Sequence, residues 1–70
     1  MYDYSKLRGR IREKFGAQAA FAKALNISSV SLSAKLNNKV EFSQGEMVKS
    51  CELLEIPKEQ LPIFFFYTKS

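Results

Sequence analysis

Apolar residues recur every three or four positions through most of the chain, which is the spacing of one face of an α-helix. The first such stripe consists of Tyr4, Leu7, Ile11 and Phe15. Gly16 follows it and suits a helix C-terminus, while Ser5 or Asp3 can cap the start. The pattern therefore predicts a first helix at about residues 5–15.

Two short helices separated by a sharp interruption are predicted next. Residues 17–25 have very high helix propensity, and Asn26, which tolerates the left-handed conformation, interrupts them. Ser28 is a good N-cap for a third helix at about 29–37, which Asn38 can end in a left-handed conformation.

The sequence from Ser43 to Glu46 matches a capping box and predicts a fourth helix at about 44–54. The apolar stripe of this helix consists of Met47, Val48, Cys51 and Leu54. Pro57 can open a short fifth helix from Lys58 to Leu61. We expect Pro62 to stop that helix and residues 63–67 to form a strand or a tail.

These elements predict an all-α fold. It is a compact five-helix domain, four long helices plus one short, that fills residues 1–70 and carries an aromatic tail at 62–70. Its helix-turn-helix lies at about 18–36, and no alternating strand pattern is present.

Composition narrows the classes of function. The 70 residues are 46% hydrophobic, which favours a packed core over disorder, and no apolar run is long enough to span a membrane. There is no His and one Cys, Cys51, which we expect in the core of a cytoplasmic protein. Because no catalytic motif, phosphate-binding loop or ligand cluster appears, we expect neither an enzyme nor a metal or other cofactor.

Charge divides the chain into two halves. Residues 1–40 contain eight basic and two acidic residues, a net charge of +6, whereas residues 41–70 have a net charge of −2. The cations Arg8, Arg12 and Lys14 are predicted to face outward from the first helix. Such a surface is either a solvated face or a contact for a polyanion or an acidic partner.

The second and third predicted helices meet the packing requirements of a helix-turn-helix. The inward-facing positions are Phe21, Leu25, Ile27 and Leu32, and Ala22 is small where the helices approach. The run Gln18-x-x-Phe21-Ala22-x-x-Leu25-Asn26-Ile27-Ser28, followed by Leu32-Ser33 and Leu36-Asn37-Asn38-Lys39, resembles the helix-turn-helix of the phage repressor and Cro family. It departs from that pattern at Asn26 and Asn38, where Gly is common, and at Lys35, which is often apolar.

The resemblance implies a DNA-binding transcriptional regulator that acts in a phage switch between lysogeny and lysis. Its third helix would lie in the major groove of operator DNA. The base-facing positions would be Ser29, Val30 and Ser33, with Ser28 beside them. The phosphate-contacting residues would be Gln18, Asn37, Asn38 and Lys39. Lys35 could contact a base or a phosphate, or its side chain could lie over the protein surface.

The predicted base-reading positions are chemically poor, because no Arg, Gln or Asn lies between Ser28 and Leu36. Small phage regulators similar to this chain also include antirepressors, which bind the phage repressor protein. The alternative function is therefore modulation of a repressor through the same helix-turn-helix surface, instead of or together with DNA. The aromatic run at 63–67 either folds back near Tyr2 and Tyr4 or mediates a partner or homodimer contact.

Overall fold

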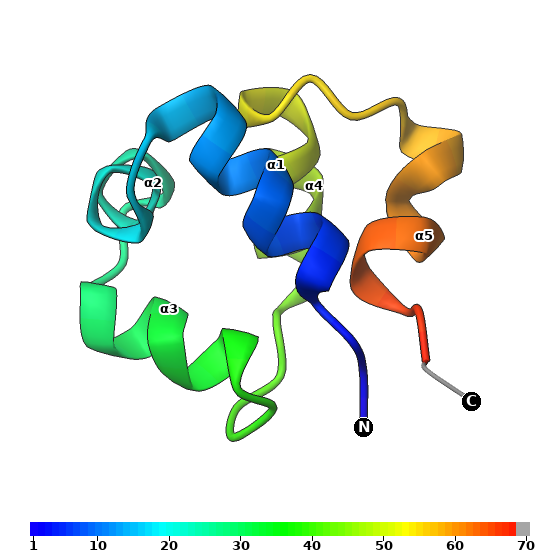
Figure 1. The fold of residues 1–70 in the computed structure, drawn as a ribbon, viewed down its shortest axis with the longest axis horizontal. Helices are drawn as coiled ribbons and strands as arrows, with labels where there is room; N and C mark the ends of the chain where they lie inside the picture. The colour runs from blue at the N-terminus through cyan, green and yellow to red at the C-terminus, as the bar shows by residue number, and fades with distance from the viewer. Residues whose placement is uncertain (69–70) are drawn as a thin grey trace.

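The computed structural model describes residues 1–68, which form five α-helices and one 3-10 turn (Figure 1). In chain order the elements are α1 (Ser5–Phe15), α2 (Gln18–Leu25), α3 (Ser29–Leu36), α4 (Gln44–Leu53), η1 (Lys58–Gln60) and α5 (Leu61–Phe65). Within residues 1–68 there is no strand. The all-α, five-helix prediction is confirmed; the part of the predicted tail at 69–70 lies outside the described residues.

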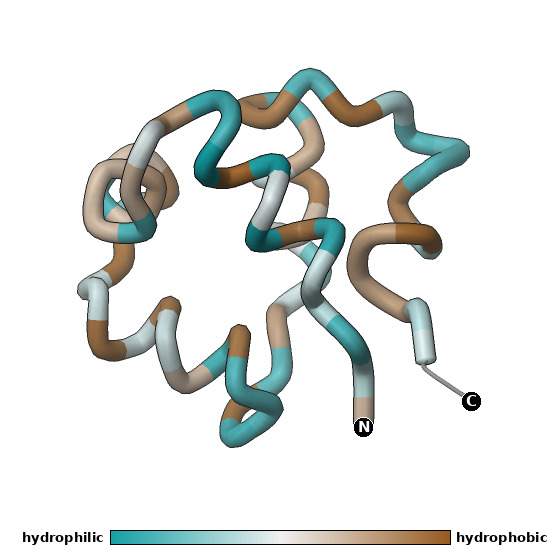
Figure 2. Tube along the Cα trace, viewed as in Figure 1, coloured by the Kyte–Doolittle hydropathy of each residue, from teal (hydrophilic) through white to brown (hydrophobic). Residues whose placement is uncertain are grey.

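Helix α1 crosses the middle of the molecule, with α2 and α3 on one side and α5 on the other (Figure 1). It packs against α2 and α5, and α4 lies behind it in contact with both of those helices. Hydrophobic and hydrophilic residues alternate along α1 and α3, as the brown and teal segments of Figure 2 show. One cluster of buried side chains joins all five helices.

Local signals account for most helix boundaries. Ser28 accepts a hydrogen bond from the Ser31 N–H at 3.0 Å, and Ser43 and Glu46 form the predicted capping box. Asn26 and Asn38 both adopt the left-handed conformation, with φ values of 65° and 62°. Gly16 follows the last residue of α1 as predicted, with a φ of 80°, so each of the first four helices begins or ends where the local chemistry predicts.

The start of α1 differs in detail from the prediction. Its N-cap residue is Tyr4, which makes no side-chain capping bond. Instead, the Asp3 carboxylate accepts hydrogen bonds from both the backbone and the hydroxyl of Ser5. The helices α3 and α4 each end one residue earlier than expected, at Leu36 and Leu53.

The prediction that Pro62 ends the fifth helix is wrong. Lys58–Gln60 form a 3-10 turn, and α5 begins at Leu61 with Pro62 in its first turn. A proline is compatible with that position because the N–H groups of a first turn have no partner within the helix. Residues 63–65, expected to be a strand or a tail, are therefore helical.

The buried side of α4 also differs from the prediction. Val48 is 40% exposed, whereas Ser50 is fully buried and its hydroxyl has no hydrogen-bond partner within residues 1–68. Cys51 is buried as expected, and this burial raises the pKa of its thiol. A raised pKa disfavours the thiolate, so Cys51 has the character of a core residue.

The two ends of the described chain meet. The Asp3 N–H donates a hydrogen bond to the Tyr67 carbonyl at 2.8 Å, and Phe65 is buried in the core at 1% exposure. Within residues 1–68, no helix has the length and apolar character needed to cross a membrane.

Candidate partner-binding surface

Helices α2 and α3 are joined by a tight turn centred on Asn26. The Ile27 N–H donates to the Ala22 carbonyl at 3.0 Å, which is possible because Asn26 is left-handed. Ala22 is 1% exposed, and Phe21 and Leu32 are fully buried. These contacts fix the angle between the two helices and leave the opposite side of α3 in solvent.

The outward side of α3 forms a shallow, largely apolar hollow of about 460 Å³. Val30, an apolar residue on this side, is 80% exposed. The hollow is lined by Ser29, Val30, Ser33, Ala34, Asn37 and Lys39. Five of the residues predicted as contacts therefore come together here, whereas Ser28 lines a neighbouring hollow towards α2.

Lys35 is not part of this hollow. Its ammonium lies 3.1 Å from the Glu46 carboxylate and donates to the Glu41 carbonyl at 3.2 Å, and its side chain is only 11% exposed. Burial alone would raise the pKa of Glu46, but hydrogen bonds from the Ser43 backbone and Lys35 lower it below its ordinary value. Lys35 thus ties α3 to the start of α4, and we do not assign it to the contact surface.

The side-chain amides of Asn37 and Asn38 make internal contacts. Asn38 accepts from the Tyr2 N–H at 3.0 Å and donates to the Tyr2 carbonyl at 2.8 Å. Asn37 accepts from the Arg8 guanidinium at 2.9 Å. Both residues therefore hold the end of α3 against the N-terminal segment and α1, a role that sequence reasoning missed.

Two arginines of α1 lie near the predicted phosphate-contacting residue Gln18. Arg8 and Arg12 line a cleft of about 360 Å³ with Ile11, Gly16, Ala17 and Gln18. Arg8 also donates to the Leu36 carbonyl at 3.1 Å and so reaches the end of α3. The spacing of residues 8 and 12, one helical turn apart, is the sequence signal that places both on one side of α1.

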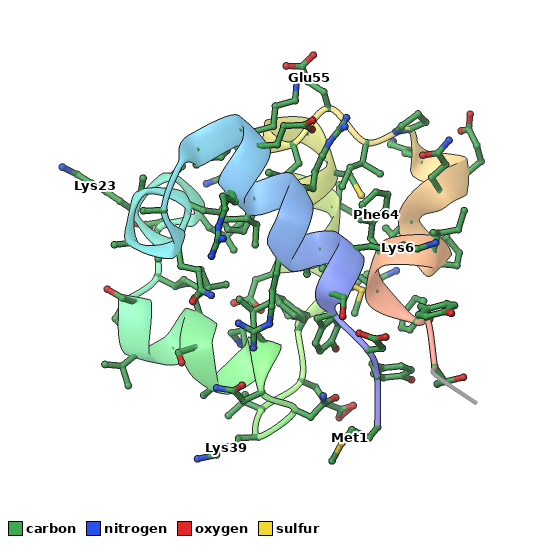
Figure 3. The ribbon with its side chains drawn as sticks, viewed as in Figure 1. Met1, Lys6, Lys23, Lys39, Glu55 and Phe64 are labelled. Atoms are coloured by element: carbon green, nitrogen blue, oxygen red, sulfur yellow. The ribbon has the colours of Figure 1, made fainter. Side chains whose placement is uncertain are left out.

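The aromatic run divides between core and surface. Phe65 is buried and Phe64 packs against the core, which is the folded-back arrangement that the sequence allowed. Tyr2, Phe66 and Tyr67 remain 37–44% exposed, and we call these three side chains the exposed aromatic group. The rings of Tyr2 and Phe66 lie 5.6 Å apart. The Lys6 side chain extends from α1 towards α5 (Figure 3), and its ammonium lies 5.1 Å from the centroid of the Tyr67 ring.

Residues 1–68 match the profile of a family described as "Protein of unknown function (DUF739)". The chain belongs to this family. It is also similar to a solved structure, the solution structure of the modulator of repression (MOR) of the temperate bacteriophage TP901-1 from Lactococcus lactis. The two are 43% identical, the similarity covers 93% of this chain and 88% of that chain, and the TM-score is 0.82. No curated protein matches the chain.

The surface of this DUF739 protein around α3 combines apolar, hydroxyl and cationic side chains. Val30 and Ala34 offer apolar contact, Ser29 and Ser33 offer small hydroxyls, and the cations stand at the margins. Within residues 1–68, no three His, Cys, Asp or Glu side chains are arranged to hold a metal ion. The arrangement can bind a complementary surface by packing and charge.

Proposed function

We propose that this protein is a phage-encoded regulator that modulates repression by binding the repressor protein of its phage. The similarity to MOR carries the proposal, since 43% identity over nearly the whole of both chains accompanies a TM-score of 0.82. Binding would change the repressor's contacts with operator DNA and so bias the choice between lysogeny and lysis. The protein would act in the cytoplasm of the bacterial host, where the repressor operates.

The surface of α3 supports a protein partner over a specific DNA sequence. Base reading in the major groove relies mainly on Arg, Lys, Asn or Gln side chains that make paired hydrogen bonds. Here the outward positions Ser29 and Ser33 are short, and Val30 presents only methyl groups at 80% exposure. We therefore interpret α2 and α3 as a repressor-like helix-turn-helix whose outer side packs against another protein.

Calorimetry with the cognate repressor and a mobility-shift assay with its operator test this function. We expect a stable complex between the two proteins and a changed mobility shift when both are present. Val30→Glu should weaken the complex by about tenfold or more, because it places a charge in an apolar contact. Val48→Glu on α4 is the matched control and should leave the affinity within about twofold.

A second pair of variants tests where the repressor sits. Phe66→Ser changes the exposed aromatic group and leaves the α3 hollow intact. Loss of binding in Phe66→Ser but not in Val30→Glu would move the contact from α3 to the exposed aromatic group. Sedimentation of the protein alone, with and without Phe66→Ser, reports whether the same group mediates a homodimer.

Direct binding to operator DNA is the second candidate function. The net charge of +6 on residues 1–40 favours it, because cations displace the counterions of DNA. A tight, sequence-specific shift by this protein alone would support the second candidate over the first. The absence of any shift at low salt, together with a stable repressor complex, would rule it out.

A further inference from the structure

Within residues 1–68, the ion pairs between side chains involve cations near α4. The cations on the side of α2 and α3 are not among these pairs. No Asp or Glu occurs between Glu13 and Glu41, a stretch that contains four lysines. Carboxylates pair with the cations that face α4: Arg10 with Glu13, Lys14 with Glu55, and Lys35 with Glu46. The cations on the side of α2 and α3 have no carboxylate partner among these ion pairs.

Arg8 and Arg12 stand at the centre of that face and line the cleft of about 360 Å³ beside Gln18. The guanidinium of Arg8 is held by the Leu36 carbonyl and the Asn37 amide, both neutral groups, and none of the ion pairs found within residues 1–68 includes it. Arg12 is exposed, and no side-chain hydrogen bond or ion pair of it is found within residues 1–68. One fixed and one adaptable guanidinium therefore face the same cleft.

We propose that this cleft receives an acidic side chain, Asp or Glu, of the bound protein partner. The inference rests on the proposed function, because the partner is the repressor. A carboxylate is complementary to two guanidinium groups, which can donate paired hydrogen bonds to it. Fixing Arg8 in advance lowers the entropy that is lost when the contact forms.

The neighbouring hollow on α3 favours a protein over a nucleic acid phosphate as the source of the anion. Val30 and Ala34 make that hollow apolar, and Lys39 at its edge adds one more cation. A protein surface can present an apolar side chain to α3 and a carboxylate to the cleft at once. The partner's contact surface is thus expected to combine an apolar side chain with an acidic one.

The test measures binding of the full chain to the cognate repressor by calorimetry, at about 50 mM and about 500 mM salt. Arg12→Glu should weaken the complex by at least about tenfold, because it places like charges together, and Arg12→Gln by about two- to fivefold. Lys49→Glu, an equal charge change on α4, is the matched control. High salt should weaken the wild-type complex and have a smaller effect on Arg12→Glu.

The possible outcomes distinguish a failure of the acidic contact from a failure of the proposed repressor binding. A wild-type complex that is equally tight in Arg12→Glu and at both salt concentrations overturns the acidic contact but leaves the proposed function standing. No wild-type complex overturns both. If Arg12→Glu abolishes binding to duplex DNA while the repressor complex is unchanged, the cleft holds a phosphate and the proposal is wrong. Selective, salt-dependent loss of the repressor complex in the Arg12 variants supports it.

Discussion

Both sides of α1 carry basic residues, but the two sets of basic residues have different neighbours. On the side towards α4, Arg10 donates to the Leu54 and Glu55 carbonyls at 2.9 and 3.0 Å, and Lys14 pairs with Glu55. On the side towards α2 and α3, Arg12 projects into solvent beside a cleft. The first side joins the helix to α4, and the second is exposed to solvent.

This difference shows that the role of a basic residue in a small domain can be assigned only when the groups that surround its side chain are known. The sequence presents Arg8, Arg10, Arg12 and Lys14 as one basic run. The fold separates the run into residues that stabilise the end of α4 and residues that define a cationic face. The variants below test that separation, beginning with the scaffold itself.

The largest effect is expected from Phe65→Ala in the scaffold. Phe65 is 1% exposed and packs edge-on to Phe42, with ring centroids 5.1 Å apart. Its removal should cost about 3–5 kcal/mol of unfolding free energy, enough to unfold much of a domain this small. Urea unfolding followed by circular dichroism measures it. Phe66→Ala is the matched control, because Phe66 is 44% exposed, and an equal loss there would contradict the assignment of Phe65 to the core.

Arg10→Ala and Arg12→Ala compare the two sides of α1 directly. Arg10→Ala should lower the unfolding free energy by about 1–3 kcal/mol, because it removes charged hydrogen bonds to carbonyls at the end of α4. Arg12→Ala should change it by less than about 0.5 kcal/mol. The midpoint of urea unfolding reports both values. Similar losses in the two variants would show that the sides of α1 do not differ.

Acidification should loosen the link between α3 and α4. The pKa of the Glu46 carboxyl is held below its ordinary value of 4.5, so its contribution to stability is present above that pH. The contribution is lost as the pH falls through the lowered pKa of the folded state. Glu46→Gln should therefore lose about 1 kcal/mol near neutral pH. Thermal unfolding from pH 7 to 3 checks this, and a constant difference between variant and wild type across that range would contradict it.

The smallest effect is expected at Ser50, in the centre of α4. Its buried hydroxyl has no hydrogen-bond partner among the described residues 1–68, which costs free energy that a methyl group would not. Ser50→Ala should raise the unfolding free energy by up to about 1 kcal/mol, since Ala also has the higher helix propensity. A clear loss of stability, measured by thermal unfolding, would indicate that the hydroxyl has a stabilising contact.

The sequence predicted those parts of the fold that depend on nearby residues. The capping box from Ser43 to Glu46 and the left-handed Asn26 are local arrangements, and both occur where they were expected. The sequence did not predict that Val48 would be exposed and Ser50 buried. The helices packed against α4 determine which edge of its apolar face is buried, and the local pattern does not specify those contacts. Nor did it indicate the left-handed Glu55, whose backbone carbonyl binds Arg10 from far along the chain.

The sequence predicted only part of the candidate surface on α3. Ser29, Val30 and Ser33 share one side of α3 because their spacing is helical, and they line one hollow. Lys35, Asn37 and Asn38 follow the same local pattern but contact Glu46, Arg8 and Tyr2, respectively. Their partners lie 11 to 36 positions away along the chain, so no local pattern could identify them.

The position of Phe65 has a consequence for how the protein is made. Phe65, the core side chain of α5, and Tyr67, whose carbonyl accepts the hydrogen bond from Asp3, are added by the ribosome only after residues 1–64. Synthesis at about 5–20 residues per second is slow compared with helix formation, so α1 to α4 can form early and wait, with their apolar sides uncovered. Stable folding should therefore follow the emergence of α5, and until then the nascent chain exposes apolar side chains that the folded protein buries.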